Sequence, residues 1–168
     1  MISPSRCFTA LTALLAVAPP AMADTAKLTI SGRVSAGTCV LTAAPIALDA
    51  VKANVLKVGD HGLKNGTLAL NSCVGVTKAK LTFEGIAADA DVDRWKNTAG
   101  TDAAKGVSIV LLSGATGSDN LKKGDSVGVA VTGATASYAL RAGYHVKNLA
   151  ELGTGVVESA ITVTAAYE

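Results

Sequence analysis

The sequence predicts an all-β fold, a sandwich of two antiparallel sheets in one domain. Short segments rich in Val, Thr, Ala and Ile alternate apolar and polar residues, as half-buried strands do. Glycines and polar turn residues separate these segments, and no stretch shows a convincing helical period. Many short strands divided by turns are typical of a sandwich rather than of a helical or mixed fold.

The first 23 residues are expected to be a secretory signal peptide. Arg6 precedes an apolar run at 7–18 that is too short to span a bilayer, and small residues at Ala21 and Ala23 suit a signal peptidase. The mature chain would begin at Asp24. It would contain no second apolar run of membrane-spanning length, so we expect it to be soluble or part of an extracellular assembly.

The charges of the chain nearly balance. With Arg6 removed in the leader, 14 of the 15 basic residues remain against 13 acidic ones. Such a balance gives no reason to expect nucleic acid or a charged membrane surface as a partner.

Two cysteines, Cys39 and Cys73, remain after the leader. Because an exported protein folds in an oxidising compartment, we expect a disulfide between them. The loop-entropy estimate for about 35 enclosed residues is roughly 3 to 4 kcal/mol of stabilisation. A metal site is the alternative, but two thiols without nearby histidines make a poor one.

Residues 28–36 alternate like a strand with one buried face. That face holds the side chains of Leu28, Ile30, Val34 and Ala36, with Gly32 in its middle. The alternation by itself favours the first strand of an ordinary sandwich. The competing interpretation is a strand donated to another copy of the protein by β-augmentation.

Proline interrupts the next segment. Residues 40–42 and 46–48 flank Pro45, which confines this region to a sheet edge or a strand break. Residues 51–58 give a weaker signal, and a short helical turn is one interpretation there.

Asn65-Gly66 predicts a tight hairpin turn, because this dipeptide favours the backbone conformation of two-residue loops. A strand at 67–73 would follow it directly. Another alternating strand is expected at 78–85.

The charged stretch at 89–96 is interpreted as a loop, and it contains the single tryptophan, Trp95. Its ring either covers the end of the sandwich or contacts a receptor from an exposed position, and the first interpretation is favoured. Residues 106–112 are apolar on both faces, which predicts a central, buried strand. Residues 113–126 are rich in turn residues.

The end of the chain holds two more predicted strands, at 138–144 and 159–167, with a loop at 148–155 between them. An immunoglobulin-like sandwich needs a seventh strand to close its core, and six are predicted after residue 37. We therefore expect an open apolar groove beside the last strand, which is an aggregation hazard unless it is filled. Filling the groove of one copy with residues 28–36 of the next gives a head-to-tail contact that produces a fibre.

In these features the chain resembles the chaperone-usher pilus subunits of type 1 and P pili. Their donor segments alternate and carry a glycine seven residues before the first cysteine, as Gly32 precedes Cys39. Two residues near the C-terminus also match: Tyr167, which is penultimate, and Gly155, which is the fourteenth residue counted from the end. Further matching blocks are 70–73, 82–85, 106–112 and 138–144.

The resemblance implies an incomplete immunoglobulin-like β-sandwich, the pilin fold, with six strands plus an N-terminal donor strand. The signal peptide at 1–23 would be followed by the donor segment at 24–37 and the pilin domain at 38–168. The chain would be a structural subunit of a cell-surface pilus or fimbrium, assembled by donor-strand exchange and supporting cell adhesion.

The resemblance also implies partners and roles for particular residues. The partners are further pilin copies, a periplasmic chaperone, an outer-membrane usher and, for an adhesive subunit, a host receptor. Export would run through the periplasm to the cell surface. The acceptor groove and chaperone-binding strand would contain Gly155, Ile161, Val163, Ala165 and Tyr167. The donor strand would contain Leu28, Ile30, Gly32, Val34 and Ala36.

Within the donor strand, Gly32 would let the backbone approach a shallow part of the groove, where a larger residue clashes. We therefore expect substitutions of Gly32 to impair assembly more than the same substitutions of Gly37.

Two other functions are compatible with the sequence. One is a minor adaptor or adhesive subunit that binds a host ligand through loops, including the Trp95 region. The other is a closed, secreted β-sandwich with an unrelated binding function.

An enzyme is not expected, and neither is a cofactor. His61 and His145 have no neighbouring nucleophile, and the chain has no nucleophile elbow or phosphate loop. Asp89, Asp91 and Asp93 alternate, but the glycine and later glutamate of a calcium loop are missing, so no metal site is predicted.

Overall fold

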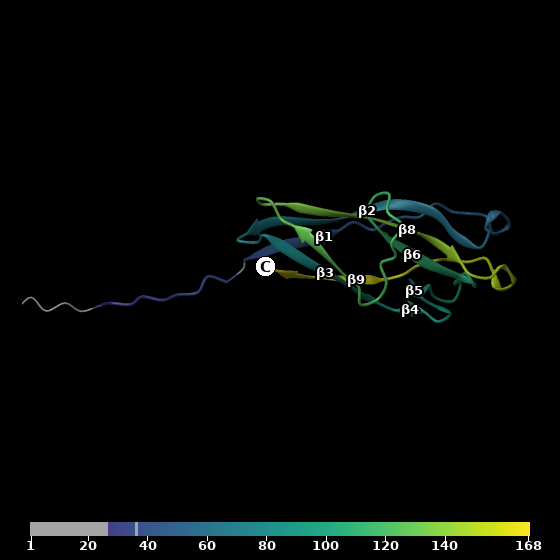
Figure 1. Ribbon diagram of the computed structural model, residues 1–168. Helices are drawn as coiled ribbons and strands as arrows, with labels where there is room; N and C mark the ends of the chain where they lie inside the picture. Colours follow the sequence, from purple (N-terminus) through teal and green to yellow (C-terminus); the bar gives the residue numbers. More distant parts are fainter. Residues whose placement is uncertain (1–26, 36) are drawn as a thin grey trace, which may run out of the picture. The chain divides into compact units, whose positions relative to one another are not determined.

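The structure is a computed structural model that describes residues 27–35 and 37–168 (Figure 1). The chain divides after Arg33 into an N-terminal part and a domain that begins at Val34. Residues 27–33 contain no strand and are exposed. The expected signal peptide at 1–23 lies outside the described residues.

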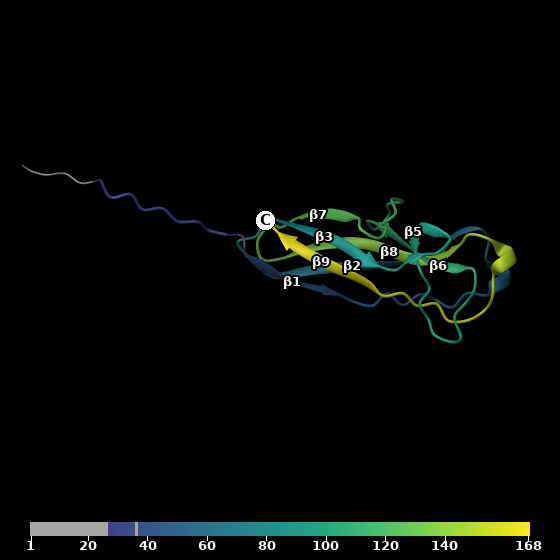
Figure 2. The same cartoon turned by 90° about the horizontal axis from the view of Figure 1, so that it is seen from below.

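The domain consists of two antiparallel sheets, as expected for an all-β sandwich (Figures 1 and 2). The larger sheet has the strand order β1-β2-β8-β6-β5-β4, and the smaller sheet has the order β7-β3-β9. The bounds are β1 Thr38–Ala43, β2 Gly59–Val74, β3 Lys78–Gly85, β4 Ala87–Ala88, β5 Asp91–Trp95, β6 Val107–Ser113, β7 Ser126–Ala130, β8 Ala136–Val146 and β9 Ile161–Tyr167.

The hydrophobic core lies between the inner faces of the two sheets. Leu68 and Leu70 of β2 pack there with Leu81 and Phe83 of β3, and each of these side chains is at most 4% exposed. They occupy alternate positions of their strands, because successive side chains of a strand point to opposite faces. The disulfide between Cys39 and Cys73 is formed and joins β1 to β2.

All six expected strands are present, as β1, β2, β3, β6, β8 and β9. The stretch predicted to be central is β6, which lies between β8 and β5 and buries four consecutive residues from Ile109 to Leu112. Pro45 follows a strand break, since β1 ends at Ala43 and forms an edge of its sheet. The helical turn considered for 51–58 is the short 3-10 helix η1, Ala53–Val55.

The hairpin predicted at Asn65-Gly66 is wrong. β2 runs straight through these residues, and Gly66 pairs with Leu140 of β8. Packing explains the glycine, because a Cβ at Gly66 would fall 2.3 Å from Cδ1 of Ile46. The missing side chain makes room for Ile46, and the long ladder to β8 outweighs the turn preference of the dipeptide.

The loop predicted at 89–96 is also wrong. Residues Ala87–Ala88 and Asp91–Trp95 form the hairpin of β4 and β5, and Trp95 pairs with Ile109 of β6. The indole ring is fully buried, and its Nε1 donates a hydrogen bond to the carbonyl oxygen of Leu121 at 2.8 Å. The buried ring of Trp95, near the end of the charged stretch, holds that stretch in the sheet. Trp95 is therefore not exposed for contact with a receptor.

Three short strands were not predicted: β4, β5 and β7. Ser126–Ala130 forms β7 and pairs with β3, although it follows a turn-rich segment and contains Gly128. Among the described residues, no helix has the length and hydropathy needed to cross a bilayer.

Candidate strand-acceptor groove

The two sheets expose unpaired edges on the same side of the domain. β1 is the outer strand of the larger sheet and β9 that of the smaller sheet, and neither pairs with the other. They are nevertheless close, because the hydroxyl of Tyr167 donates a hydrogen bond to the carbonyl oxygen of Cys39 at 3.0 Å. The first and last strands therefore run along the same side of the domain without a backbone ladder between them (Figure 2).

β9 forms one wall of this opening and is a regular alternating strand. Its β-branched and small residues suit a pleated surface that is half buried. One backbone edge of β9 forms a ladder with β3, in which Val163 pairs with Phe83. On its other edge, none of the strands that the structure describes lies beside the N–H and C=O groups. The side chains that face the core are half-buried: Ile161, Val163, Ala165 and Tyr167.

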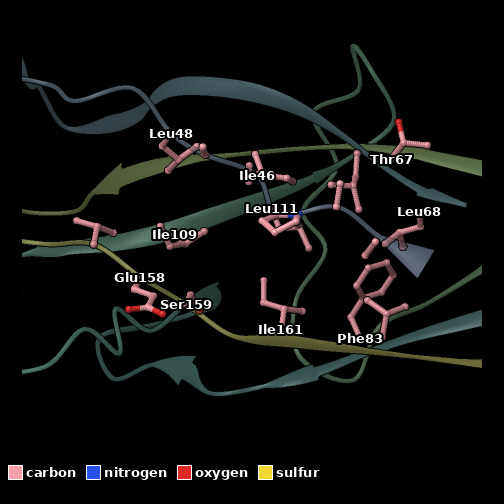
Figure 3. A pocket seen from close by; sticks show the side chains of 18 of the residues that line it. Ile46, Leu48, Thr67, Leu68, Phe83, Ile109, Leu111, Glu158, Ser159 and Ile161 are labelled. Atoms are coloured by element: carbon pink, nitrogen blue, oxygen red, sulfur yellow. The ribbon is translucent and has the colours of Figure 1, made fainter. Parts of the chain in front are cut away.

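An apolar cavity of about 480 Å³ lies in the opening (Figure 3). Residues 43–48 form one wall and residues 157–163 form the other. Figure 3 shows Ile46 and Leu48 on one side of the cavity and Ile161 on the other. The floor consists of core side chains of both sheets, including Phe83, Ile109, Leu111 and Leu140.

A second cavity of about 390 Å³ adjoins the first and shares Leu48, Tyr144 and Val157 with it. Burial raises the pKa of Tyr144 above its ordinary value of 10.0, and the nearby Asp49 charge adds to the effect. The Tyr144 hydroxyl donates to the carbonyl oxygen of Asp49 at 3.0 Å. Together the two cavities follow the chain from Leu152 to Val163 in β9, whereas Ala165 and Tyr167 line neither of them.

Gly155 lines the second cavity and precedes β9 rather than lying within it. Its φ of +151° and its contacts require glycine, because a Cβ would fall 2.2 Å from the carbonyl oxygen of Asp102. This close approach permits a parallel bridge between Val156 and Ala103. Gly155 thus has a structural role at the end of the groove.

Sequence reasoning missed the wall at 43–48. Ile46 and Leu48 alternate with Ala47, but Pro45 predicted a strand break, so no burial was predicted for the residues that follow it. Both side chains pack against the core without belonging to a strand. A proline-broken edge followed by alternating apolar residues is the signal that could have identified this wall.

Of the residues expected in the donor strand, Leu28, Ile30 and Gly32 belong to the N-terminal part, and Val34 is the first residue of the domain. The side chains of Leu28, Ile30 and Val34 are 83%, 86% and 99% exposed. A Cβ at Gly32 would have no atom within 4 Å. Ala36 lies outside the described residues.

Both histidines make structural contacts on other parts of the domain. His145 Nδ1 lies 2.5 Å from an oxygen of Asp60, and its Nε2 lies 3.6 Å from an oxygen of Asp91. His61 Nε2 lies 2.8 Å from the carbonyl oxygen of Lys57. The part of the chain that the structure describes holds no cluster of three potential metal ligands.

The alternating aspartates are each engaged by a different partner. Asp89 pairs with Lys96 at 2.8 Å, and Asp93 pairs with Lys122 at 3.1 Å. The Asp93 carboxylate also raises the pKa of Lys122; its hydrogen bond to Lys122 has the larger effect and its charge the smaller one. These carboxylates form separate ion pairs in β5 and in the turn before it, rather than converging on one point.

Comparison with known proteins rests on structure, because no family model matches the chain and no similar sequence is found among curated proteins. The P pilus rod subunit PapA matches with a TM-score of 0.65 at 15% identity, covering 79% of this chain and 100% of that one. A structure of a chaperone-usher pilus concerned with rod uncoiling matches with a TM-score of 0.63 at 16% identity, covering 90% of this chain and 100% of that one.

The CupB6 tip adhesin from Pseudomonas aeruginosa matches with a TM-score of 0.64 at 21% identity. The match covers 77% of this chain but only 38% of the adhesin, so the chain spans well under half of that protein. Together the matches show the class of fold: an immunoglobulin-like β-sandwich of the kind found in chaperone-usher pilus subunits.

Proposed function

We propose that this chain is a structural subunit of a cell-surface pilus, polymerised by donor-strand exchange. Each copy would insert residues 28–36 into the groove of a neighbouring copy. The observation that carries the proposal is the apolar groove between residues 43–48 and the start of β9, on the side of the domain where β1 and β9 form no ladder with each other. The chain also carries, ahead of β1, an exposed segment with the alternation that such a groove accepts.

Two kinds of interaction would hold the donor strand. The free edge of β9 supplies backbone N–H and C=O groups for a ladder, as in other cases of strand addition. Leu28, Ile30 and Val34 would leave water and fill the groove, and full burial of each contributes roughly 1.5 to 3 kcal/mol. Ala36 would add a smaller contact, and Gly32 would let the backbones approach closely.

The acceptor strand of the proposal is β9 with the segment before it. The inward side chains of Ile161, Val163, Ala165 and Tyr167 would contact the inserted strand, and Gly155 would shape the end of the groove. A periplasmic chaperone would occupy the same groove before assembly, because an open apolar groove favours aggregation. An outer-membrane usher would then pass the subunit to the cell surface.

The proposed route agrees with the covalent structure. A leader at 1–23 would direct the chain to the periplasm, where the disulfide between Cys39 and Cys73 forms in an oxidising environment. The role in adhesion follows from the fibre rather than from chemistry in the domain, and the proposal gives the chain no catalytic activity.

The alternatives are less well supported. Host binding through an exposed Trp95 is inconsistent with a ring that is fully buried. A closed sandwich with an unrelated function would not need an apolar groove beside an unpaired edge strand. A minor adaptor would differ from the main shaft subunit in its neighbours. Removing the gene distinguishes the two: loss of a shaft subunit would abolish the filaments, whereas loss of an adaptor would only alter them.

The experiment compares the two faces of the donor strand in the full mature chain. Ile30→Asp places a charge on the face that enters the groove, whereas Ser31→Asp places the same charge on the opposite face. We expect Ile30→Asp, like deletion of 24–36, to abolish fibres seen by electron microscopy and detergent-resistant polymers seen by electrophoresis. Ser31→Asp should assemble.

A synthetic peptide of residues 24–37 tests the groove directly. It should raise the unfolding temperature of the deletion variant, and the same peptide with Ile30 replaced by Asp should not. Wild-type fibre yield from the deletion variant would contradict the proposal. So would a refolded monomer whose unfolding temperature does not change when the peptide is added.

A further inference from the structure

Exposed valines lie at both ends of the domain. Val74 is 74% exposed at the end of β2, next to the start of β1. At the opposite end, Val51 and Val156 are 40% and 54% exposed and line the second cavity. The 16 residues of β2 separate the two ends. At the usual rise per residue, this corresponds to roughly 50 Å.

Register places the second cavity at the far end from Val74. Val107 lines this cavity and pairs with Val146, which in turn pairs with Gly59 at the start of β2. Val74 is the last residue of the same strand. One molecule therefore cannot bring Val74 into contact with Val156, whereas two successive copies can.

The backbone at Gly37, just before β1, is held tightly against the end of β2. The Gly37 N–H donates to the carbonyl oxygen of Gly75 at 3.2 Å. A Cβ at Gly37 would fall 1.5 Å from the carbonyl oxygen of Val74, so the two backbones are in contact. Only Gly37 separates residue 36, the last donor position, from Thr38 in β1. One residue spans at most about 3.6 Å, so the donating domain must lie directly against the groove that holds its segment.

The direction of the inserted strand determines which end of the acceptor's groove the donating domain lies against. At the Tyr167 end of the groove, the acceptor's own chain enters β1, as the hydrogen bond from Tyr167 to Cys39 shows. A strand inserted parallel to β9 would place the donating domain at that crowded end. A strand antiparallel to β9 places it at the end formed by Gly155 and Val156, where the side chain of Val156 is 54% exposed.

We propose that the Val74 end of each copy docks against the rim formed by Val51 and Val156 on the copy that accepts its strand. This rests on the proposed function and adds a second contact to it. Apolar side chains that are exposed in the monomer lose water on both sides of the joint. The contact stiffens the joint and slows its dissociation, while the inserted strand supplies most of the affinity.

The test uses charges on opposite sides of the joint in the full mature chain. We expect fibres of Val74→Glu and of Val156→Glu to dissociate roughly fivefold faster than wild type and to bend more in electron micrographs. The chain with both Val74→Lys and Val156→Glu should recover most of the loss, because its opposite charges meet across each joint. Val92→Glu, a 70% exposed site on β5, is the matched control.

Peptide binding separates this inference from the proposed function. The Val74 and Val156 variants, each with residues 24–36 deleted, should still bind a peptide of residues 24–37 as the parent deletion does. Fibres of both single variants that match the Val92→Glu control would overturn the joint and leave donor-strand exchange intact. A wild-type chain that forms no fibres and ignores the peptide would overturn both.

Discussion

The hydroxyl of Tyr167 donates a hydrogen bond to the carbonyl oxygen of Cys39, and this bond spans the open side of the sandwich. The two residues are 128 positions apart and belong to the outer strands of different sheets. Tyr167 therefore joins the last strand to the first where no backbone ladder does. The bond fixes one end of the groove and leaves the rest of it open.

Removing this hydroxyl is expected to destabilise the domain modestly. Tyr167→Phe keeps the ring but leaves the Cys39 carbonyl without this partner, at a cost of about 0.5 to 1.5 kcal/mol. Urea unfolding of the full mature chain measures the change. Tyr138→Phe is a suitable control, because it also removes a tyrosine hydroxyl bond, to Ser113, away from the groove. An unchanged midpoint for Tyr167→Phe would show that the bond contributes nothing.

Gly66 and Ile46 are expected to be energetically coupled. Gly66→Ala introduces a methyl group 2.3 Å from Cδ1 of Ile46 and 2.9 Å from Cδ1 of Leu140. Such overpacking costs about 1 to 3 kcal/mol. In the double variant with Ile46→Ala, the clash with Ile46 disappears, so the loss should be smaller than the sum of the two single losses. Additive losses in urea unfolding would mean that the two side chains do not compete for one space.

Tyr144 is expected to make stability fall at alkaline pH. Because burial raises its pKa in the folded state, folding favours the protonated phenol. This contribution is fully present below the unfolded pKa near 10.0 and is lost as pH rises through the folded value. The unfolding temperature of wild type should therefore fall more steeply than that of Tyr144→Phe as pH rises above about 9. Parallel curves for the two proteins would contradict the assignment.

Gly32 is expected to be the most sensitive position of the donor strand. Gly32→Val should impair fibre formation while leaving the domain folded, since nothing lies within 4 Å of its Cβ position in the free chain. Gly37 is unsuitable for comparison, because any side chain there strikes the carbonyl of Val74 and disturbs the domain itself. Gly100, which is exposed and equally unobstructed, is the better control. Equal assembly by Gly32→Val and Gly100→Val would remove the special role of Gly32.

Strand alternation predicted the parts of the fold that have a clear inner face. Ile161, Val163, Ala165 and Tyr167 lie on one face of β9, as their spacing indicates. In the apolar run at 106–112, the four residues from Ile109 to Leu112 are buried on both faces, as their composition indicates. In both cases the local pattern and the tertiary packing favour the same structure.

Prediction failed where a tertiary contact opposed a local preference. Asn65-Gly66 has the composition of a turn, but the space that Gly66 leaves for Ile46 cannot be inferred without knowing what lies opposite. The charged residues before Trp95 have the composition of a loop, but one buried ring holds them in a strand. The groove wall at 43–48 was missed for a related reason, because those residues pack inward without belonging to a strand.

The disulfide between Cys39 and Cys73 has a mechanical consequence. Tension along the proposed fibre would enter each domain at Gly37 and reach β1 first, and β1 is an edge strand whose backbone ladder lies on one side only. Cys39 is the second residue of β1, and its covalent bond transfers that load at once to β2, the longest strand of the domain. The load then acts on β2, which is paired with strands on both sides, and the hydrogen bonds of β1 do not break one after another.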